Sequence, residues 1–437
     1  MCIQAGRKCP GLQKGPLIVD MTGIAKHGMR KRQPKPSAKR IVMPVWPWIN
    51  SADKFLPTIS QRFVVTEAFY ARFLAYFTSE GESKDIQNRR TWLHSLPILY
   101  TDGTNDALVL AVQGTASAYC AVEIGNLALV QHSWQVYGEA LRKHTGLISR
   151  STTKHEVTVH MVSTSVLFSF FEAMQATSAD AYCAHIYGAV RMLQITKPKQ
   201  CSQGVLCQIF YHLRTQLAFI NLASTGRGAS VQVQQILYGA LEYNRLPMFQ
   251  RVMNHTSSLV EMYVKRRNGE TQQSFPRTAY AMIKAELESL WHEYQEEAAN
   301  MGTPVLRADG NHGAFQFRDA FTALTVAYFS AASILLDTAG FHLTNSSLGL
   351  ADYYATILQA SRHLQSDRIA LAYMRMAVPL LLVALHSPGL SQREQAAGCF
   401  KHWTNGSMSG ISALALEAIG HHHAIANHEL YPASPSA

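Results

Sequence analysis

The sequence predicts an all-α protein, a large multi-helix body of helix-on-helix packing preceded by a disordered, basic, proline-containing N-terminal arm. From about residue 58 onward, apolar residues recur at three- and four-residue intervals, and strand-like alternation is sparse. Short connections containing Gly, Pro, Ser or Asn separate the periodic stretches. The 437 residues, 47% hydrophobic and 16% charged, are enough for a large folded core.

The N-terminal arm holds nearly all the excess charge. Residues 1–40 contain ten Lys or Arg against the single acid Asp20, which leaves 29 basic and 28 acidic residues for the rest of the chain. Seven of the sixteen prolines lie within residues 10–57, where their fixed φ and missing N–H disfavour helix and sheet. We therefore expect residues 13–57 to be a disordered linker. A basic arm is typical of nucleic-acid contact, nuclear import or an anionic surface.

The helices of the body are expected in the following order. The stretch RFVVTEAFYARFLAYF places an aromatic stripe on one helical face, and core packing accounts for it. Asn105 and Asp106 open two helices that Lys143, His144 and Gly146 close with a basic last turn and a glycine stop. Further helices are predicted at about 156–175, 180–195, 204–222, 231–243, 248–267, 276–300, 313–338, 348–366, 368–386, 390–404 and 408–427.

One segment, IALAYMRMAVPLLLVAL at 369–385, is apolar enough to require a membrane test. It is seventeen residues long, contains Arg375 and Pro379, and lacks flanking basic clusters or an aromatic belt. We therefore expect it to be a buried central helix, and we expect no membrane association.

The chain lacks the sequence signatures of common enzymes. GRGASV at 226–231 lacks the last glycine of a dinucleotide loop, and GSMSG at 406–410 has Met408 where a nucleophile serine belongs. The HHH run, His421 to His423, has no carboxylate or cysteine at helical spacing to complete a metal site, and we interpret it as a helix C-terminal surface. We expect the protein not to be an enzyme.

Two cysteines lie near the start of the chain, in the stretch CIQAGRKCPG. This stretch resembles the last third of the fungal binuclear zinc cluster, a DNA-binding module in which six cysteines hold two zinc ions. In that pattern Cys2 and Cys9 occupy the fifth and sixth ligand positions, and the basic linker that follows is similarly typical of the family. The other cysteines, Cys120, Cys183, Cys201, Cys207 and Cys399, show no paired metal spacing and are interpreted as reduced thiols.

A second stretch, from FSFFEAMQ to HLRTQLAF, is similar to the signature region of the fungal-specific transcription factor domain. His185, Gly188 and Ala189 match its H-x-x-G-A core, and Phe210 to Arg214 match the aromatic-to-arginine stretch that follows. The late apolar segment VPLLLVALHSPGL and the subsequent Arg393 resemble the closing helix of the family. The resemblance runs from Cys2 to about residue 425 and implies a nuclear transcription regulator.

The departure from the family pattern concerns zinc. Four of the six cysteines are missing, and two thiolates cannot hold the binuclear site. The complete family cluster would bind zinc, but we expect none to be bound by this chain as written. Sequence-specific DNA binding is then lost or incomplete, and either an upstream exon supplies the other ligands or the chain is a truncated form.

His185 has two interpretations. It is either a packed core residue, with Gly188 and Ala189 allowing a neighbouring helix to approach closely, or a ligand or regulatory contact. The family-motif residues, His185, Gly188, Ala189, Arg214 and Arg393, are expected to be mainly structural.

The sequence thus predicts a cluster remnant at 1–12, a basic linker at 13–57, a helical regulatory domain at 58–430 and a tail at 431–437. The expected partners are DNA, bound specifically only with the upstream cluster, a second copy in a homodimer, and the transcription machinery or co-regulators. The alternative is a truncated helical module that binds a protein partner or an apolar small ligand. The residues expected to contact DNA or to direct nuclear import are Arg7, Lys8, Lys14, Arg30, Lys31, Arg32, Lys35, Lys39 and Arg40.

Overall fold

The computed structural model describes residues 59–78, 92–154, 157–175, 179–196, 204–224, 248–269, 277–300, 302, 305–308, 315–340, 352–367, 374–404, 406 and 408–430. Nearly all of these residues are helical, and the sheet among them is a single two-stranded hairpin. The prediction of an all-α body is confirmed for this part of the chain.

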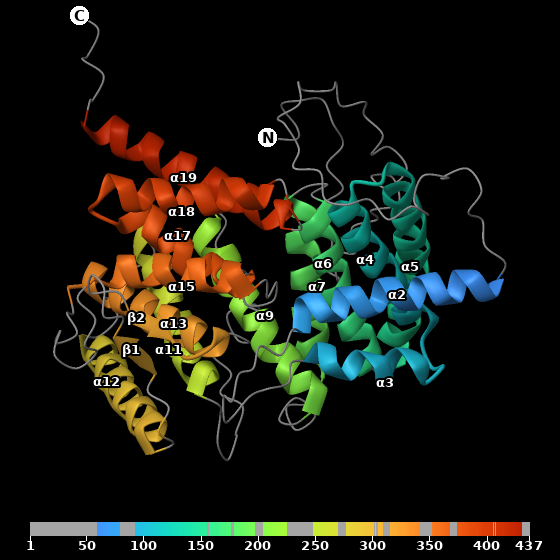
Figure 1. Cartoon of the computed structure of the whole chain (residues 1–437), viewed down its shortest axis with the longest axis horizontal. Coiled ribbons are helices and arrows are strands. Elements are labelled where there is room, and N and C mark those ends of the chain that lie inside the picture. Colours follow the sequence, from blue (N-terminus) through green and yellow to red (C-terminus); the bar gives the residue numbers. More distant parts are fainter. Residues whose placement is uncertain are drawn as a thin grey trace, which may run out of the picture.

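The first group of helices lies at the right of Figure 1 and packs around α4 and α6. Its members are α2 (Ile59–Thr78), the 3-10 helix η2 (Trp92–Ser95), α3 (Leu96–Thr101), α4 (Asp106–Ile124), α5 (Leu127–Lys154), α6 (Val159–Gln175) and α7 (Ala179–Ile195). α4 packs against α2, α5 and α6, and α6 packs against α7. Both ends of α4 are capped. At its start the Asn105 side chain accepts a hydrogen bond from the Leu108 N–H, and at its end Gly125 adopts a left-handed φ of 65°.

The second group lies at the left of Figure 1 and packs around α13. It contains α11 (Met248–Arg267), α12 (Arg277–Asn300), β1 (Leu306–Ala308), β2 (Phe315–Phe317), α13 (Ala320–Thr338), α15 (Tyr353–Asp367), α17 (Ala377–His386) and α18 (Leu390–Thr404). β1 and β2 are antiparallel, with Arg307 opposite Gln316.

Two helices join the groups. α9 (Gly204–Ala223) packs against η2, α6 and α7 on one side and against α11 and α17 on the other. α19 (Ser409–Leu430) packs against α6, α7 and α9 as well as α17 and α18. Because α9 is buried on both sides, every side chain from Ile209 to Ala223 is buried.

The long apolar helices belong to the interior. α4 and α13 are long and apolar enough to cross a membrane by length and composition, yet 67% and 89% of their apolar windows are buried in the fold. In the segment that the sequence analysis tested, Ala377 to Leu385 are all buried in α17. The interpretation of this part as a buried helix is confirmed, and residues 369–373 lie outside the described residues.

Three helix predictions need correction. α5 does not stop at Gly146 but continues to Lys154. The helix predicted from 313 begins only at Ala320, because β2 precedes it and the Asp319 side chain caps it by accepting the Thr322 N–H. The short helices η2 and α3 were not predicted. The helix predicted at 231–243 lies outside the described residues.

Candidate functional site

The residues predicted to bind metal, DNA or import factors all lie within residues 1–58, outside the described residues. The remaining predicted residues are placed on three helices. His185, Gly188 and Ala189 lie on α7, Arg214 lies on α9, and Arg393 lies on α18. α7 and α9 pack against each other, but His185 contacts Tyr137 of α5 and Arg214 bonds Asn254 of α11, so the structure does not bring these side chains together.

His185 belongs to a polar network in which α5, α6 and α7 meet. The Tyr137 hydroxyl lies 2.6 Å from Glu172 Oε1 and 2.7 Å from His185 Nε2. Glu172 and Tyr137 are buried, and 11% of the His185 side chain remains exposed. With His185 neutral, its Nε2–H donates to the Tyr137 oxygen and the Tyr137 O–H donates to the carboxylate, so one proton arrangement satisfies all three groups. The network therefore locks three helices together.

A second buried histidine adjoins this network. His144 Nε2 lies 2.9 Å from Ser165 Oγ, and the ring of Phe168 lies between His144 and His185, 5.5 and 5.3 Å from their ring centroids. Burial lowers the pKa of His185 to about 3, with His144 as a smaller cause, and burial lowers the pKa of His144 to about 4. Both imidazoles are therefore neutral at pH 7.

The aromatic ring of Tyr137 is fixed as firmly as its hydroxyl. It stacks on Phe171 at a centroid separation of 4.0 Å, and Trp134 meets both rings edge-on. Burial raises the pKa of Tyr137, and the neighbouring Glu172 raises it further. The hydroxyl is thus a hydrogen-bond donor that stays protonated, and this arrangement favours a structural role over acid–base chemistry.

Among the described residues, Gly188 does not permit the close helix approach that we expected. A Cβ built on Gly188 would meet no atom within 4 Å, so no neighbouring helix approaches there. The close approach occurs instead at Gly410, where a Cβ would lie 2.7 Å from the carbonyl oxygen of Glu172. Ala189 is fully buried in the core.

Arg214 is a buried cation held by α11. Its Nη1 donates to Asn254 Oδ1 at 2.6 Å, and Glu261, which is paired with Lys265 at 2.7 Å, lies near enough to favour its charge. Burial nevertheless lowers the pKa of Arg214 to about 10. These contacts fasten α9 to α11.

Arg393 fastens the turn between α17 and α18. Its Nη1 donates to the Ser387 carbonyl oxygen at 2.8 Å, and its backbone N–H bonds the Gly389 carbonyl. Ser387 is the C-cap residue that follows the end of α17. This arginine therefore satisfies a carbonyl at a helix C-terminus, a local structural role.

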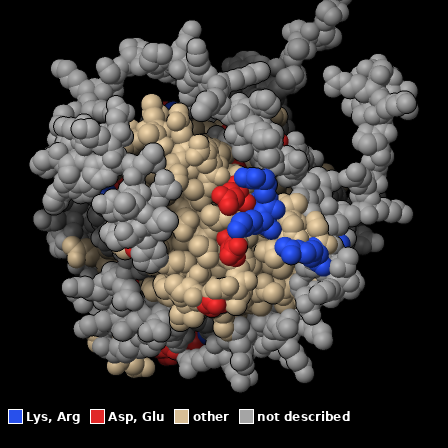
Figure 2. All heavy atoms as spheres, turned by 90° about the vertical axis from the view of Figure 1, so that its right-hand side faces the viewer, with Lys and Arg blue, Asp and Glu red and all other residues tan. Residues whose placement is uncertain are grey.

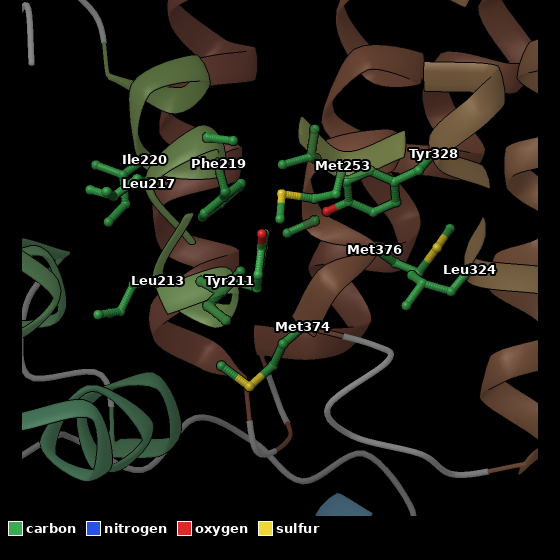
Figure 3. Close-up of a cluster of buried hydrophobic side chains, with 14 of the residues drawn as sticks. Tyr211, Leu213, Leu217, Phe219, Ile220, Met253, Leu324, Tyr328, Met374 and Met376 are labelled. Carbon is green, nitrogen blue, oxygen red and sulfur yellow. The ribbon is translucent and has the colours of Figure 1, made fainter. Parts of the chain in front are cut away.

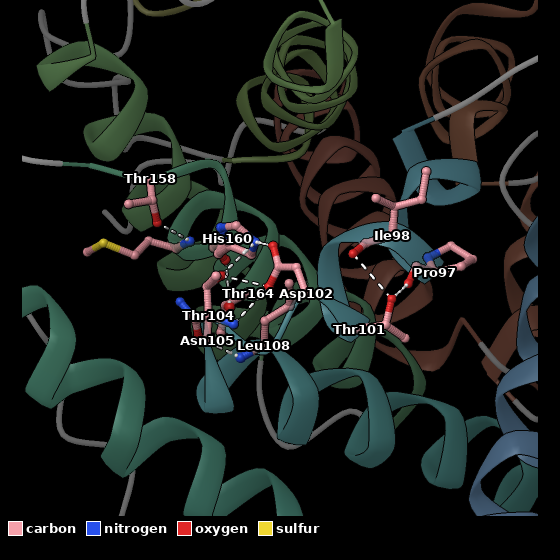
Figure 4. Close-up of polar contacts among 11 residues, drawn as sticks. Pro97, Ile98, Thr101, Asp102, Thr104, Asn105, Leu108, Thr158, His160 and Thr164 are labelled. Carbon is pink, nitrogen blue, oxygen red and sulfur yellow. Dashed lines mark hydrogen bonds and ion pairs between the residues drawn. The ribbon is translucent and has the colours of Figure 1, made fainter.

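A carboxylate–imidazole pair lies where the starts of α4 and α6 meet (Figure 4). His160 Nε2 lies 2.6 Å from Asp102 Oδ2 and 3.2 Å from Thr104 Oγ1. The Thr104 hydroxyl and N–H also bond Asp102 Oδ1, and these bonds, with His160 as a smaller cause, lower the pKa of Asp102. Because both partners meet the same imidazole nitrogen, the group cannot pass a proton from hydroxyl to carboxylate through the ring.

The histidine run at the end of α19 contributes one interior contact. His422 meets His386 edge-on at a centroid distance of 5.9 Å, and His421 is exposed. Within the described ranges, no group of three or more His, Cys, Asp or Glu side chains is arranged to hold a metal ion.

Sequence reasoning missed Tyr137, His212 and the unpaired state of Arg375. His212 on α9 is fully buried, stacks on Phe170 at 5.4 Å, and has no hydrogen-bond partner at either ring nitrogen. Arg375 precedes α17, and its Nε is buried without a partner. For Arg375, the surrounding apolar stretch is the signal that could have indicated a buried charge. The polar flanks of Tyr137 and His212 give no such signal.

No protein-family model, no curated protein and no solved structure matches the chain.

Proposed function

We propose that the chain is a nuclear transcription regulator of the fungal zinc-cluster type, in which the helical body is the regulatory domain. One observation carries the proposal. The two signature stretches, at His185 and at Phe210 to Arg214, follow a basic C-x6-C arm in the family order and lie on helices α7 and α9, which pack together in one core. No catalytic role is proposed, since Tyr137, Asp102 and Arg214 are each bonded to side chains of neighbouring segments and hold these segments together.

The charge distribution supports a division of labour between arm and body. Residues 1–40 carry ten basic residues and one acid, while the rest of the chain is close to neutral. On the face shown in Figure 2, Lys and Arg gather in one small area beside acidic residues, and most of the other described surface is uncharged. Phosphate contacts are therefore expected from the arm.

Zinc enters the proposal through the complete family cluster alone. Cys2 and Cys9 are two of the six thiolates that the cluster needs, and a binuclear thiolate site with two ligands does not form. The chain as written should bind DNA weakly and without sequence preference, because no metal-held helix fixes side chains against base edges.

A DNA titration tests this part of the proposal. The full chain is titrated on GC-rich duplexes and scrambled duplexes at two salt concentrations, with zinc content measured in parallel. We expect equal affinities and a log–log salt slope of about −0.9 for each phosphate contacted. Fusing a four-cysteine segment upstream should add two zinc ions and a preference for the GC-rich duplex. Discrimination by the unextended chain would show that the interpretation of Cys2 and Cys9 is wrong.

Nuclear import is tested separately. The stretch KHGMRKRQPKPSAKR at 26–40 has two basic clusters around a short proline-containing spacer. Alanine at Arg30, Lys31, Arg32, Lys39 and Arg40 in a fluorescent fusion should abolish nuclear accumulation. Alanine at Arg7, Lys8 and Lys14 is the matched control for loss of charge. Unchanged accumulation of the five-residue variant would rule the signal out.

The regulatory role of the body is tested with a heterologous DNA-binding domain fused to the full chain. We expect the fusion to change expression of a reporter gene, up or down, relative to the DNA-binding domain alone. Co-purification should then identify a second copy or transcription co-regulators as partners. A fusion that folds, reaches the nucleus and leaves the reporter unchanged would contradict the proposal and favour the helical binding module.

A further inference from the structure

One side of α5 is exposed along the surface of the first helix group. α5 packs against α4 and, to a smaller extent, against α6. An interior helix such as α9 is covered on both sides, and Figure 3 shows its Leu217 and Phe219 within a cluster of buried apolar side chains. α5 differs, because Tyr137, Ala140 and His144 are buried on one side while exposed residues lie on the other. This exposed side is available to a partner.

Glycine and arginine alternate on the exposed side at every fourth position. This Gly–Arg ridge consists of Gly138, Arg142, Gly146 and Arg150. Side chains four residues apart on an α-helix lie next to one another, so the four positions form one continuous row. Both arginines are exposed, and a Cβ built on either glycine would meet no atom within 4 Å. The ridge therefore combines two cationic side chains with open space beside each of them.

Each arginine of the ridge is bonded to the glycine four residues before it. Arg142 Nε donates to the Gly138 carbonyl oxygen at 3.3 Å, and Arg150 Nε donates to the Gly146 carbonyl oxygen at 3.0 Å. These bonds hold long side chains against the helix surface, so less conformational entropy is lost when a partner binds them. Because Nε is the donor in both bonds, the Nη nitrogens are the donor pair for a bidentate contact with a carboxylate. The two guanidinium groups are about 12 Å apart along the helix axis, the rise of eight residues.

The charges around the ridge favour separate carboxylates over a row of phosphates. Lys143, next to Arg142 in the chain, pairs with Asp106 of α4 at 2.8 Å, and Glu139 is exposed three residues before Arg142. A continuous polyanion such as a DNA backbone would run past these acids and be repelled by them. Two separate carboxylates need contact only the two arginines. The complementary partner is therefore an acidic protein segment.

We propose that the Gly–Arg ridge of α5 docks an acidic helical segment of a partner protein, with one carboxylate of that segment on each guanidinium group. Rows of residues four apart pack into one another when two helices cross at about −50°, and the glycine positions leave gaps for the side chains of the partner helix. Carboxylates eight residues apart on the partner match the spacing of the arginines. If the chain is the regulator proposed above, the partner would be a co-regulator, but the docking itself does not depend on that function.

The test measures binding of two labelled peptides to the full-length protein by fluorescence anisotropy. Both are alanine-based helical peptides with two glutamates, eight residues apart in the probe and six residues apart in the control, where the glutamates lie about 240° apart around the helix. The peptides carry the same charge, so the basic N-terminal arm attracts both equally. We expect the probe to bind about 5- to 10-fold more tightly, with a difference that shrinks as the salt concentration rises.

Variants of the ridge should lose the preference for the probe. Arg142→Lys with Arg150→Lys keeps both charges but removes the Nε donors, so the two peptides should bind equally. Gly146→Leu should have the same effect, because its side chain fills the gap between the arginines. It should not lower the melting temperature, since the position is open and leucine favours helix more than glycine does. Arg191→Met with Arg266→Met is the matched control, which removes two exposed arginines elsewhere and should retain the preference.

Three results would overturn the proposal. The first is equal binding of the two peptides by the wild type, and the second is a preference that survives in the double lysine variant. The third is a DNA duplex whose affinity falls in that variant as much as the affinity of the probe does, since the ridge would then bind phosphates. None of these outcomes decides nuclear import or reporter activity, so failure of this docking site and failure of the proposed regulatory function are distinguishable.

Discussion

Two glycines on helices that pack against neighbouring α6 should respond to alanine in opposite directions. Gly410 lies in the first turn of α19, where a Cβ would stand 2.7 Å from the Glu172 carbonyl oxygen and 3.1 Å from the Ala173 Cα. Both atoms are backbone, so they cannot rotate away. A Cβ on Gly188 of α7 would meet nothing within 4 Å.

The magnitudes follow from these distances. Gly410→Ala forces α19 and α6 apart, and overpacking of this kind costs about 1–3 kcal/mol. The helix-propensity gain of alanine is small in a first turn, so we expect a net loss of about 1–2 kcal/mol. Gly188→Ala adds no contact and removes backbone freedom from the unfolded chain, so it should stabilise the fold by about 0.5–1 kcal/mol.

Urea unfolding at pH 7, followed by circular dichroism, measures both variants against the wild type. We expect the midpoint to fall for Gly410→Ala and to rise for Gly188→Ala. An unchanged midpoint for Gly410→Ala would show that α19 does not press on α6. A large loss for Gly188→Ala would restore the idea that this glycine permits a close helix approach.

Three more variants test the interior contacts. Tyr137→Phe should lower the free energy of unfolding in urea by about 1–3 kcal/mol, because the buried Glu172 loses the hydroxyl that donates to it. An unchanged free energy of unfolding would refute the network. Arg267→Met should cost about 0.5–1.5 kcal/mol, because its guanidinium donates to two carbonyl oxygens at the end of α9, those of Leu222 at 2.9 Å and Ser224 at 2.6 Å. Arg266→Met is the comparison with a smaller expected loss, because Arg266 donates one bond, to the Thr338 carbonyl oxygen at 3.1 Å. Burial lowers the pKa of His212 to about 3, so the unfolded chain binds the extra proton as pH drops below about 6.5, and this histidine contributes about 2 kcal/mol to the loss of stability at pH 5. His144 and His185 contribute in the same direction. His212→Phe should therefore reduce the fall in stability between pH 7 and pH 5 by about 2 kcal/mol without abolishing it, and an unaltered curve would contradict the assignment.

Helices that depend on local periodicity could be predicted from the sequence. α11, α18 and α9 lie within one residue of the predicted ranges, because their apolar spacing and flanking turns coincide. α5 passes Gly146 because Ile148 packs against the core, a tertiary contact that outweighs a glycine stop signal. The start of the helix predicted from 313 was wrong because Phe315–Phe317 pairs with Leu306–Ala308, and this antiparallel pairing is not visible in helical periodicity.

The candidate site was only partly predictable for the same reason. His185 was singled out from its motif, but Tyr137, which contacts it, lies 48 residues earlier on α5. Glu172, which accepts from Tyr137, lies on α6. Nothing in the local sequence around His185 indicates that these three residues meet. Arg375 was noticed as a charge inside an apolar stretch, which excluded a membrane helix but did not reveal that the charge would be buried without a carboxylate. Pairing of polar groups depends on how helices meet.

The polar side chains of α9 connect the two groups of helices. Burying a polar side chain costs free energy unless it is bonded, and α9 is buried on both sides. Gln216 accepts a hydrogen bond from Tyr182 of α7, whereas Arg214 bonds Asn254 of α11. One helix therefore fixes the first group of helices against the second through bonds that tolerate little sliding. His212 differs from these two residues, because both of its ring nitrogens are buried without a hydrogen-bond partner. Its unbonded imidazole stacks on Phe170 of α6, so at this position α9 is held against the first group by ring packing and not by a hydrogen bond.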